Sequence, residues 1–109
     1  MTNIQRPPDN WLPIDVDETD YVGFDFTDML ASGESVASVA VTCEVVAGTD
    51  NSPATRLSGG ALVAGAVVKQ AVTTGQTGVT YLIRCVATLA PGPRRLVLGG
   101  LLPVLKVGA

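Results

Sequence analysis

The acidic residues near the start of the chain are the first whose types and spacing suggest chemistry. Asp15, Asp17 and Asp20 stand close together, as the carboxylates of a calcium loop do. Such a loop also needs a glycine at its turn and a glutamate that closes the site, and neither is found at the required position. Paired carboxylates can also act as acid and base in hydrolysis. These acids therefore leave two chemical functions to weigh, metal binding and hydrolysis.

The rest of the composition argues against both functions. The chain contains no histidine, which is the commonest general base and metal ligand, so no Ser-His or Cys-His dyad can form. Cys43 and Cys85 are far apart in the sequence and stand alone, which argues against a zinc site. The glycine pairs at 58–60 and 75–78 have no helix start behind them that could hold a phosphate. We predict that the protein is not an enzyme and has no catalytic, metal-binding or cofactor-binding residues.

The bulk composition favours one small β domain. The 109 residues are 47% apolar, and these are mainly Ala, Val and Leu. Small branched side chains suit a pleated surface better than a helix interface, and 12 glycines and 7 prolines interrupt the chain too often for long helices. No apolar run has the length of a membrane span, and the first residues lack the pattern of a signal peptide. We expect synthesis in the cytosol and no membrane partner.

The charges are unevenly distributed along the chain. Most of the ten acids lie before residue 35, and most of the seven bases lie after it. No segment carries a basic stripe, so we expect no nucleic-acid partner. The asymmetry suits head-to-tail packing between copies of the chain, but a solvated acidic leader explains it as well.

Residues 1–18 are predicted to form an extended arm. Its three prolines keep it out of an interior strand, because proline lacks a backbone N–H and pushes the preceding residue toward an extended geometry. Trp11 in such an arm needs a pocket, which can belong either to a partner or to the chain's own domain. We include Trp11, Arg94, Arg95 and Lys106 among the expected partner-binding residues.

Alternating apolar and polar residues predict an antiparallel β-sandwich over residues 19–109. The expected strands are 21–26, 34–48, 55–57, 67–73, 79–89, 96–98 and 101–107. Thr27 is expected to cap one helical turn that ends near Gly33, and the pair at 99–100 is expected to break the chain between the last two strands. Pro103 should place the closing strand at an edge or introduce a bulge, and residues 101–107 can then pair with a neighbouring molecule.

Face assignment along these strands predicts the core. The expected core residues are Phe24, Phe26, Leu30, Val39, Val41, Cys43, Tyr81, Ile83 and Cys85. The two cysteines lie on inward faces, as in the immunoglobulin inter-sheet disulfide, but the tyrosine and tryptophan of that pattern are elsewhere. We favour free thiols over a bridge.

Two segments carry a resemblance to a known family. "DYVGFDFTDMLASGESVASVAVTCEV" and "GQTGVTYLIRCVATLAPGPRRLVL" resemble the front and back halves of small bacteriophage fibre–tail adaptors. The resemblance implies an immunoglobulin-like β-sandwich that acts as a virion structural protein. It also implies several symmetric copies that couple the tail to its fibre, with tail and fibre proteins as partners and assembly in the host cytoplasm.

Two other functions remain open from the sequence. The protein could instead be a capsid decoration or head–tail joining protein, which would be built in the same way. It could also be a carbohydrate-binding β-sandwich module, because Trp11 and Tyr21 are aromatic side chains on which sugars could stack.

Overall fold

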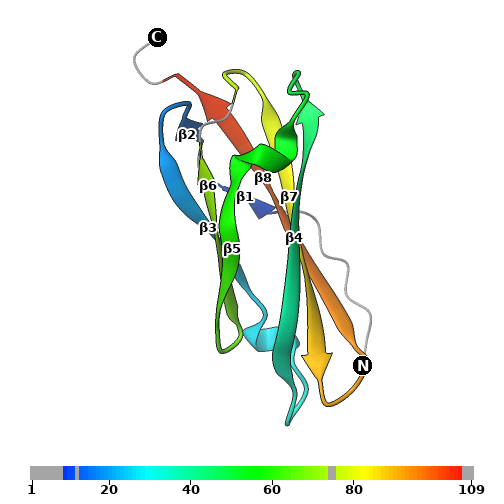
Figure 1. Cartoon of the computed structure of the whole chain (residues 1–109). Helices are drawn as coiled ribbons and strands as arrows, with labels where there is room; N and C mark the ends of the chain where they lie inside the picture. Colours follow the sequence, from blue (N-terminus) through cyan, green and yellow to red (C-terminus); the bar gives the residue numbers. More distant parts are fainter. Residues whose placement is uncertain (1–8, 12, 74–75, 107–109) are drawn as a thin grey trace.

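The computed structural model describes residues 9–11, 13–73 and 76–106, and in these the chain folds into two packed β-sheets (Figure 1). The strands are β1 (Asp9–Asn10), β2 (Ile14–Asp15), β3 (Thr19–Asp25), β4 (Ser35–Ala47), β5 (Leu57–Ala64), β6 (Val67–Thr73), β7 (Thr80–Ala90) and β8 (Arg95–Leu105). Two short 3₁₀ turns are η1 (Thr27–Met29) and η2 (Pro53–Arg56). In the described part of the chain, no helix has the length and apolar character that a membrane span requires.

The two sheets differ in size and in strand direction. The larger sheet has the order β1-β8-β7-β4, and β2 also pairs with β8. The smaller sheet has the order β3-β6-β5 and is antiparallel throughout. β1 and β2 run parallel to β8, whereas β7 is antiparallel to both of its neighbours. The prediction of an all-β sandwich is confirmed.

The strand pair β4–β7 shows how the sequence pattern positions the core. Every second residue of β7 is buried, and the residues between are half-buried apart from the exposed Arg84, as expected for a strand with one face against the core. β4 has register shifts at Val36/Ser38 and Val45/Ala47, so the predicted alternation holds only between them. Extending the alternation of Val39, Val41 and Cys43 backward would turn Ala37 inward, but Ala37 is exposed because of the first shift, and Val36 packs against the core instead.

The buried core draws on the two sheets unequally. Its members are Ile14, Val22, Phe24, Phe26, Cys43, Val68, Val72, Val79, Tyr81, Ile83, Cys85, Ala87, Leu89, Leu96, Leu102 and Val104. Leu30, Val39 and Val41, which were also expected in the core, are partly buried and pack against it. Among the described residues, β4 contributes only Cys43 to the buried set, and β5 contributes none.

The prediction that residues 99–100 break the chain is wrong. β8 is one continuous strand from Arg95 to Leu105, and its register with β7 is regular. A glycine pair usually marks a turn, but here the missing side chain at Gly100 makes room for the indole of Trp11. Pro103 likewise causes no bulge in the β7–β8 ladder.

The prediction that Thr27 caps a helical turn is also wrong. The turn η1 begins after Phe26, has no side-chain cap and ends at Met29, well before Gly33. The hydroxyl of Thr27 donates to the carboxylate of Asp25 instead. Short-range bonding of this kind competes with capping, because both use the same side-chain groups.

The two cysteines lie in the same sheet. Cys85 of β7 stands opposite Val41 of β4, and Cys43 stands opposite Ile83. Both thiols are free and buried, and burial raises the pKa of each to about 11. A bridge between two sheets is therefore not possible for this pair.

Candidate functional site

The first candidate surface is the arm side, where β1 and β2 lie along β8. The N–H of Trp11 donates to the carbonyl of Leu101 at 3.0 Å, and the N–H of Val16 donates to the carbonyl of Leu105 at 2.8 Å. Ile14, from the same segment, is buried in the core. The arm therefore covers the edge of β8 that was predicted to pair with a neighbouring molecule.

Pro103 explains why the arm pairs in two short pieces. The N–H of Val104 donates to the carbonyl of Val79, and the carbonyl of Val104 accepts from the N–H of Gly78, just before β7. The backbone N–H and carbonyl groups of the odd-numbered residues in this part of β8 therefore point the other way, toward the arm. Pro103 is one of these residues and has no N–H to offer. The pairing accordingly covers Gly100–Leu101 and Val104–Leu105 but not the proline between them.

The pocket for Trp11 belongs to the chain's own domain. Its ring stands edge-on to that of Phe24, with ring centroids 5.5 Å apart. A Cβ atom placed on Gly100 would lie 2.6 Å from the indole, so only glycine fits there. The indole thus links the arm to both sheets, and a partner-binding role for Trp11 stays a prediction.

A hollow of about 240 Å³ opens between the arm and β3. It is lined by Trp11, Ile14, Asp20, Tyr21, Val22, Val72 and Leu102. Tyr21 is 57% exposed on its rim. An apolar lining with one carboxylate and exposed aromatic rings can accept a side chain of a partner protein or the face of a sugar.

The three basic residues expected to bind a partner do not form one surface. Arg94 bonds within its own chain, to the carboxylate of Glu34 and to the carbonyl of Met29. Arg95 and Lys106 are exposed, but they lie at opposite ends of β8, which runs the length of the molecule (Figure 1). Their partner-binding role stays a prediction, but any contact must involve them separately.

The fold also weakens the charge asymmetry seen along the sequence. Asp15 pairs in register with Leu105, so the acidic turn after β2 lies beside the basic end of β8. Head-to-tail attraction between copies is therefore smaller than the sequence suggests, because Glu34 of the acidic front already pairs with Arg94 of the basic back inside one chain.

The second candidate surface is the open side, defined here as the outer edges of β4 and β5. These are the last strands of the two sheets, and they contact each other (Figure 1). Val63 of β5 is in register with the fully buried Val68, so it faces the space between the sheets, yet it is 45% exposed. The core is thus incompletely covered on this side.

β5 is irregular at its edge, and a buried amide holds it in place. Its register shifts between Ser58 and Leu62, where Gly59 has a φ of +70°. The side-chain amide of Gln70 donates to the carbonyls of Ser58 at 3.4 Å and Gly59 at 3.2 Å. Sequence reasoning missed this role, although Gln70 interrupts the inward series of Val68 and Val72 and could have been noticed.

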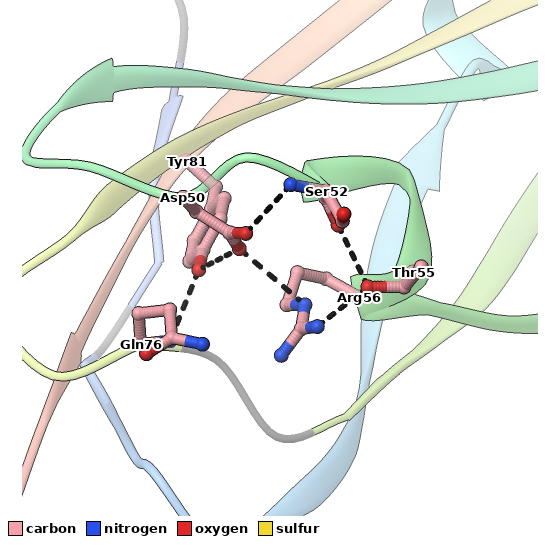
Figure 2. Close-up of polar contacts among 6 residues, drawn as sticks. All are labelled: Asp50, Ser52, Thr55, Arg56, Gln76 and Tyr81. Atoms are coloured by element: carbon pink, nitrogen blue, oxygen red, sulfur yellow. Dashed lines mark hydrogen bonds and ion pairs between the residues drawn. The ribbon is translucent and has the colours of Figure 1, made fainter.

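A polar cluster fixes the loop between β4 and β5 to β7 (Figure 2). The Tyr81 hydroxyl donates to Asp50 at 2.7 Å and accepts from the N–H of Gln76 at 3.0 Å. The N–H of Ser52 donates to Asp50 at 2.9 Å, and the Arg56 guanidinium lies 3.5 Å from the same carboxylate. Sequence reasoning missed this cluster because its partners are distant along the chain.

The electrostatics of the cluster are those of a structural contact. The N–H of Ser52 and the hydroxyl of Tyr81 lower the pKa of Asp50. Burial, together with the neighbouring Asp50 carboxylate, raises the pKa of Tyr81 to about 12. Because the pKa of Asp50 is lowered and that of Tyr81 is raised, neither group changes its protonation state near neutral pH. The hydrogen bond between them is therefore kept, and neither group is suited to transfer protons. Among the described residues, no group of three or more acids or cysteines is placed to hold a metal ion.

Comparison with known proteins gives one result. Residues 15–98 match the family model described as podophage GP4 fiber-tail adaptor protein gp77. The match begins in β2 and ends within β8, so it spans both sheets. No curated protein and no solved structure matches the chain. Because the family model covers most of the sequence and agrees with the resemblance carried by its two halves, the chain belongs to the podophage GP4 fiber-tail adaptor family.

Proposed function

We propose that this protein couples the phage tail to its fibre or receptor-binding apparatus through protein–protein contacts, as a non-catalytic structural component. The observation that carries the proposal is the family match over residues 15–98. The shape suits a spacer, since the molecule measures 49 × 27 × 23 Å and its long axis follows the strands. Its partners would be tail and fibre proteins, with no nucleic acid and no membrane.

The strand grouping supports an immunoglobulin-like topology. In constant-type immunoglobulin sandwiches, the second, fourth and fifth strands share one sheet, and the third, sixth and seventh share the other. If β1 and β2 are counted together as the first strand, the other six strands have the same grouping, whereas the first strand pairs with β8 and not with β3. Such domains present two sides and two ends, which suits a protein placed between others in several symmetric copies.

Immunogold labelling of purified virions with an antibody against this chain tests the proposal. We expect label at the tail tip or the base of the fibre. Label on the capsid or neck would favour a decoration or joining role instead, and absence of label from both intact and opened particles would contradict a virion role. The same antibody on sections of infected cells should label particles in the host cytoplasm before lysis.

A carbohydrate-binding function is the second candidate, because Tyr21 and Trp11 lie on the same hollow. Stacking of a sugar on Tyr21 would require its exposed ring, so Tyr21→Ala should remove binding while the fold is kept. A glycan array decides the question, with Tyr21→Ala as the control. A signal that is present in the original chain and lost in the variant would support this function, and silence for both would end it.

A further inference from the structure

The outer edge of β4 has no role in the contacts described so far. Within the described residues, β4 ends the larger sheet and pairs only with β7. The opposite edge, at β8, is paired with the arm at Gly100–Leu101 and Val104–Leu105, and β5 is irregular over Ser58–Leu62. β4 is regular between its two register shifts, so Ser38–Val45 offers a straight row of unpaired backbone groups.

This stretch lacks the devices that usually prevent edge pairing. Natural edges carry lysines, prolines, bulges or a covering segment. Ser38–Val45 has no proline and no base, and its only charge is Glu44. Its inward residues Val39, Val41 and Val45 are only partly buried, so its apolar side is not fully covered by its own chain. An edge of this kind is suited to strand addition.

We infer that β4 pairs with β4 of a second copy of this chain, antiparallel around a two-fold axis. Facing residues in an antiparallel pair lie on the same side of the sheet, and of the registers that satisfy this condition, two give the longest overlap between the shifts. One places Thr42 opposite its own copy, with Val41 opposite Cys43. The other places Val41 opposite its own copy, with Val39 opposite Cys43. Both join inward apolar residues to inward apolar residues.

The charges are self-complementary in both registers. Glu44 falls opposite Ala40 in the first register and opposite Ser38 in the second, so it never faces its own copy. In the same chain, Arg84 of β7 stands opposite Thr42 and is therefore the diagonal neighbour of Glu44 on the outer face. The charges of the two paired sheets are therefore balanced. An edge without excess charge favours a second copy as the partner over a strongly basic or acidic protein.

Self-pairing would also complete the open side. Val63 faces the space between the sheets and remains exposed beside β4. A strand added to β4 stands at this opening and brings a second row of inward valines to it. The interface is isologous, as in most homodimers, and it leaves the arm side of each copy available for other contacts. The inference goes beyond the proposed tail–fibre role and does not depend on it.

Sedimentation equilibrium of the purified full chain over a range of concentrations tests this interface. We expect a reversible dimer. Thr42→Lys places two like charges near the two-fold axis and should weaken the dimer at least about tenfold, without a change in circular dichroism. Thr77→Lys makes the same change in the exposed turn before β7 and should leave the dimer intact.

Other outcomes would overturn the proposal. A chain that stays monomeric at every concentration would contradict it, and so would a dimer that Thr42→Lys and Thr77→Lys affect equally. An oligomer larger than a dimer that Thr42→Lys disrupts and Thr77→Lys does not would show that β4 contacts a different strand edge of the next copy. All these outcomes are independent of where the protein lies in the virion, so they are distinguishable from failure of the tail–fibre role.

Cross-linking then resolves the register. In a Cys43→Ala background and under mild oxidation, Thr42→Cys should form a disulfide-linked dimer if Thr42 lies on the axis, and Val41→Cys should do so in the other register. Removing Cys43 is necessary because it faces Val41 in the first register, and the Cys43→Ala chain without a further cysteine is the control, which should not cross-link to the same extent. Failure of both variants to cross-link would contradict antiparallel self-pairing.

Discussion

The two outer strands of the larger sheet are treated differently. β8 is paired with the chain's own arm at Gly100–Leu101 and Val104–Leu105, with Trp11 seated over Gly100, whereas β4 ends the sheet without a neighbour among the described residues. On the arm side, Ile14, Leu102 and Val104 are buried in the core, while Tyr21 and Leu105 at its margin are exposed. On the open side, Val46 and Val63 are about half exposed. The difference indicates that the arm packs as part of the folded domain. On the open side, a strand edge and apolar side chains remain uncovered, so this is the side on which another molecule can pack.

Trp11→Ala should break the arm side most severely. The indole fills the space between Phe24 and Gly100, and its loss should lower the free energy of unfolding by about 3 kcal/mol, the lower end of the range for tryptophan because the ring is partly exposed. Val63→Ala is the matched change on the open side and should cost less than about 1 kcal/mol. Urea unfolding followed by circular dichroism measures both. Equal losses would mean that the two sides do not differ in this way.

Gly100→Ala should break the same contact from the other side. The added methyl group meets the indole, and overpacking of this kind costs about 1–3 kcal/mol. Gly99→Ala is the control, since its Cβ would lie 3.4 Å from a flexible atom of Arg84. In the Trp11→Ala background, Gly100→Ala should cost almost nothing, because the atoms it meets are gone. An unchanged cost in that background would contradict the packing described.

The long strands could be predicted from the sequence, but their environment could not. The alternation that defines β3, β4 and β7 is local, so their positions were predicted to within a few residues. The pairing of the arm with β8 is set by contacts far apart in sequence, so neither the docking of Trp11 nor its need for Gly100 was visible. A glycine pair normally indicates a turn, and the tertiary contact overrides that tendency.

The candidate sites show the same division. Arg94 was expected to bind a partner, and its ion pair with Glu34 could not be foreseen because the two residues are distant in the sequence. Its partner-binding role stays a prediction. The two cysteines were correctly placed on inward faces, but only the sheet order shows that they are neighbours in one sheet. Edge status is likewise a property of the whole fold, so the closing strand was taken as the free edge and β4 was not.

Tyr81→Phe should loosen the polar cluster that ties the loop between β4 and β5 to β7. Removing the hydroxyl takes a donor from Asp50 and an acceptor from Gln76, which should cost about 1–2 kcal/mol at pH 7. Tyr21→Phe is the control, because Tyr21 is exposed on β3, and it should change the free energy by less than about 0.5 kcal/mol.

The same variant should alter the acid limb of the stability curve. The pKa of Asp50 is lower in the folded chain than in the unfolded one, so its carboxylate stabilises the fold above pH about 4 and this contribution is lost as the pH falls further. Tyr81 supplies part of that shift, so Tyr81→Phe should lose less stability on acidification than the original chain. Parallel curves between pH 5 and 2, measured by urea unfolding, would contradict this role.

The reactivity of the two thiols should show how much more easily β4 opens than β7, without any change in the sequence. Cys43 lies on β4, which is held on one side only, whereas Cys85 lies on β7 between two strands. Both thiols are buried, which keeps the reagent away and raises the pKa of each to about 11. Near neutral pH, the strand that carries each thiol must therefore open before the thiol can react. Opening β4 breaks one ladder and opening β7 breaks two, so Cys43 should react at least about tenfold faster with iodoacetamide.

Peptide mass spectrometry of the labelled chain measures the two rates, and labelling in denaturant should show both thiols reacting alike. Equal rates in the folded chain would mean that β4 is no easier to open than β7. The concentration dependence then connects this contrast with self-pairing. A second copy seated on β4 places strands on both of its sides, so the advantage of Cys43 should shrink as the protein is concentrated, while the rate at Cys85 stays constant.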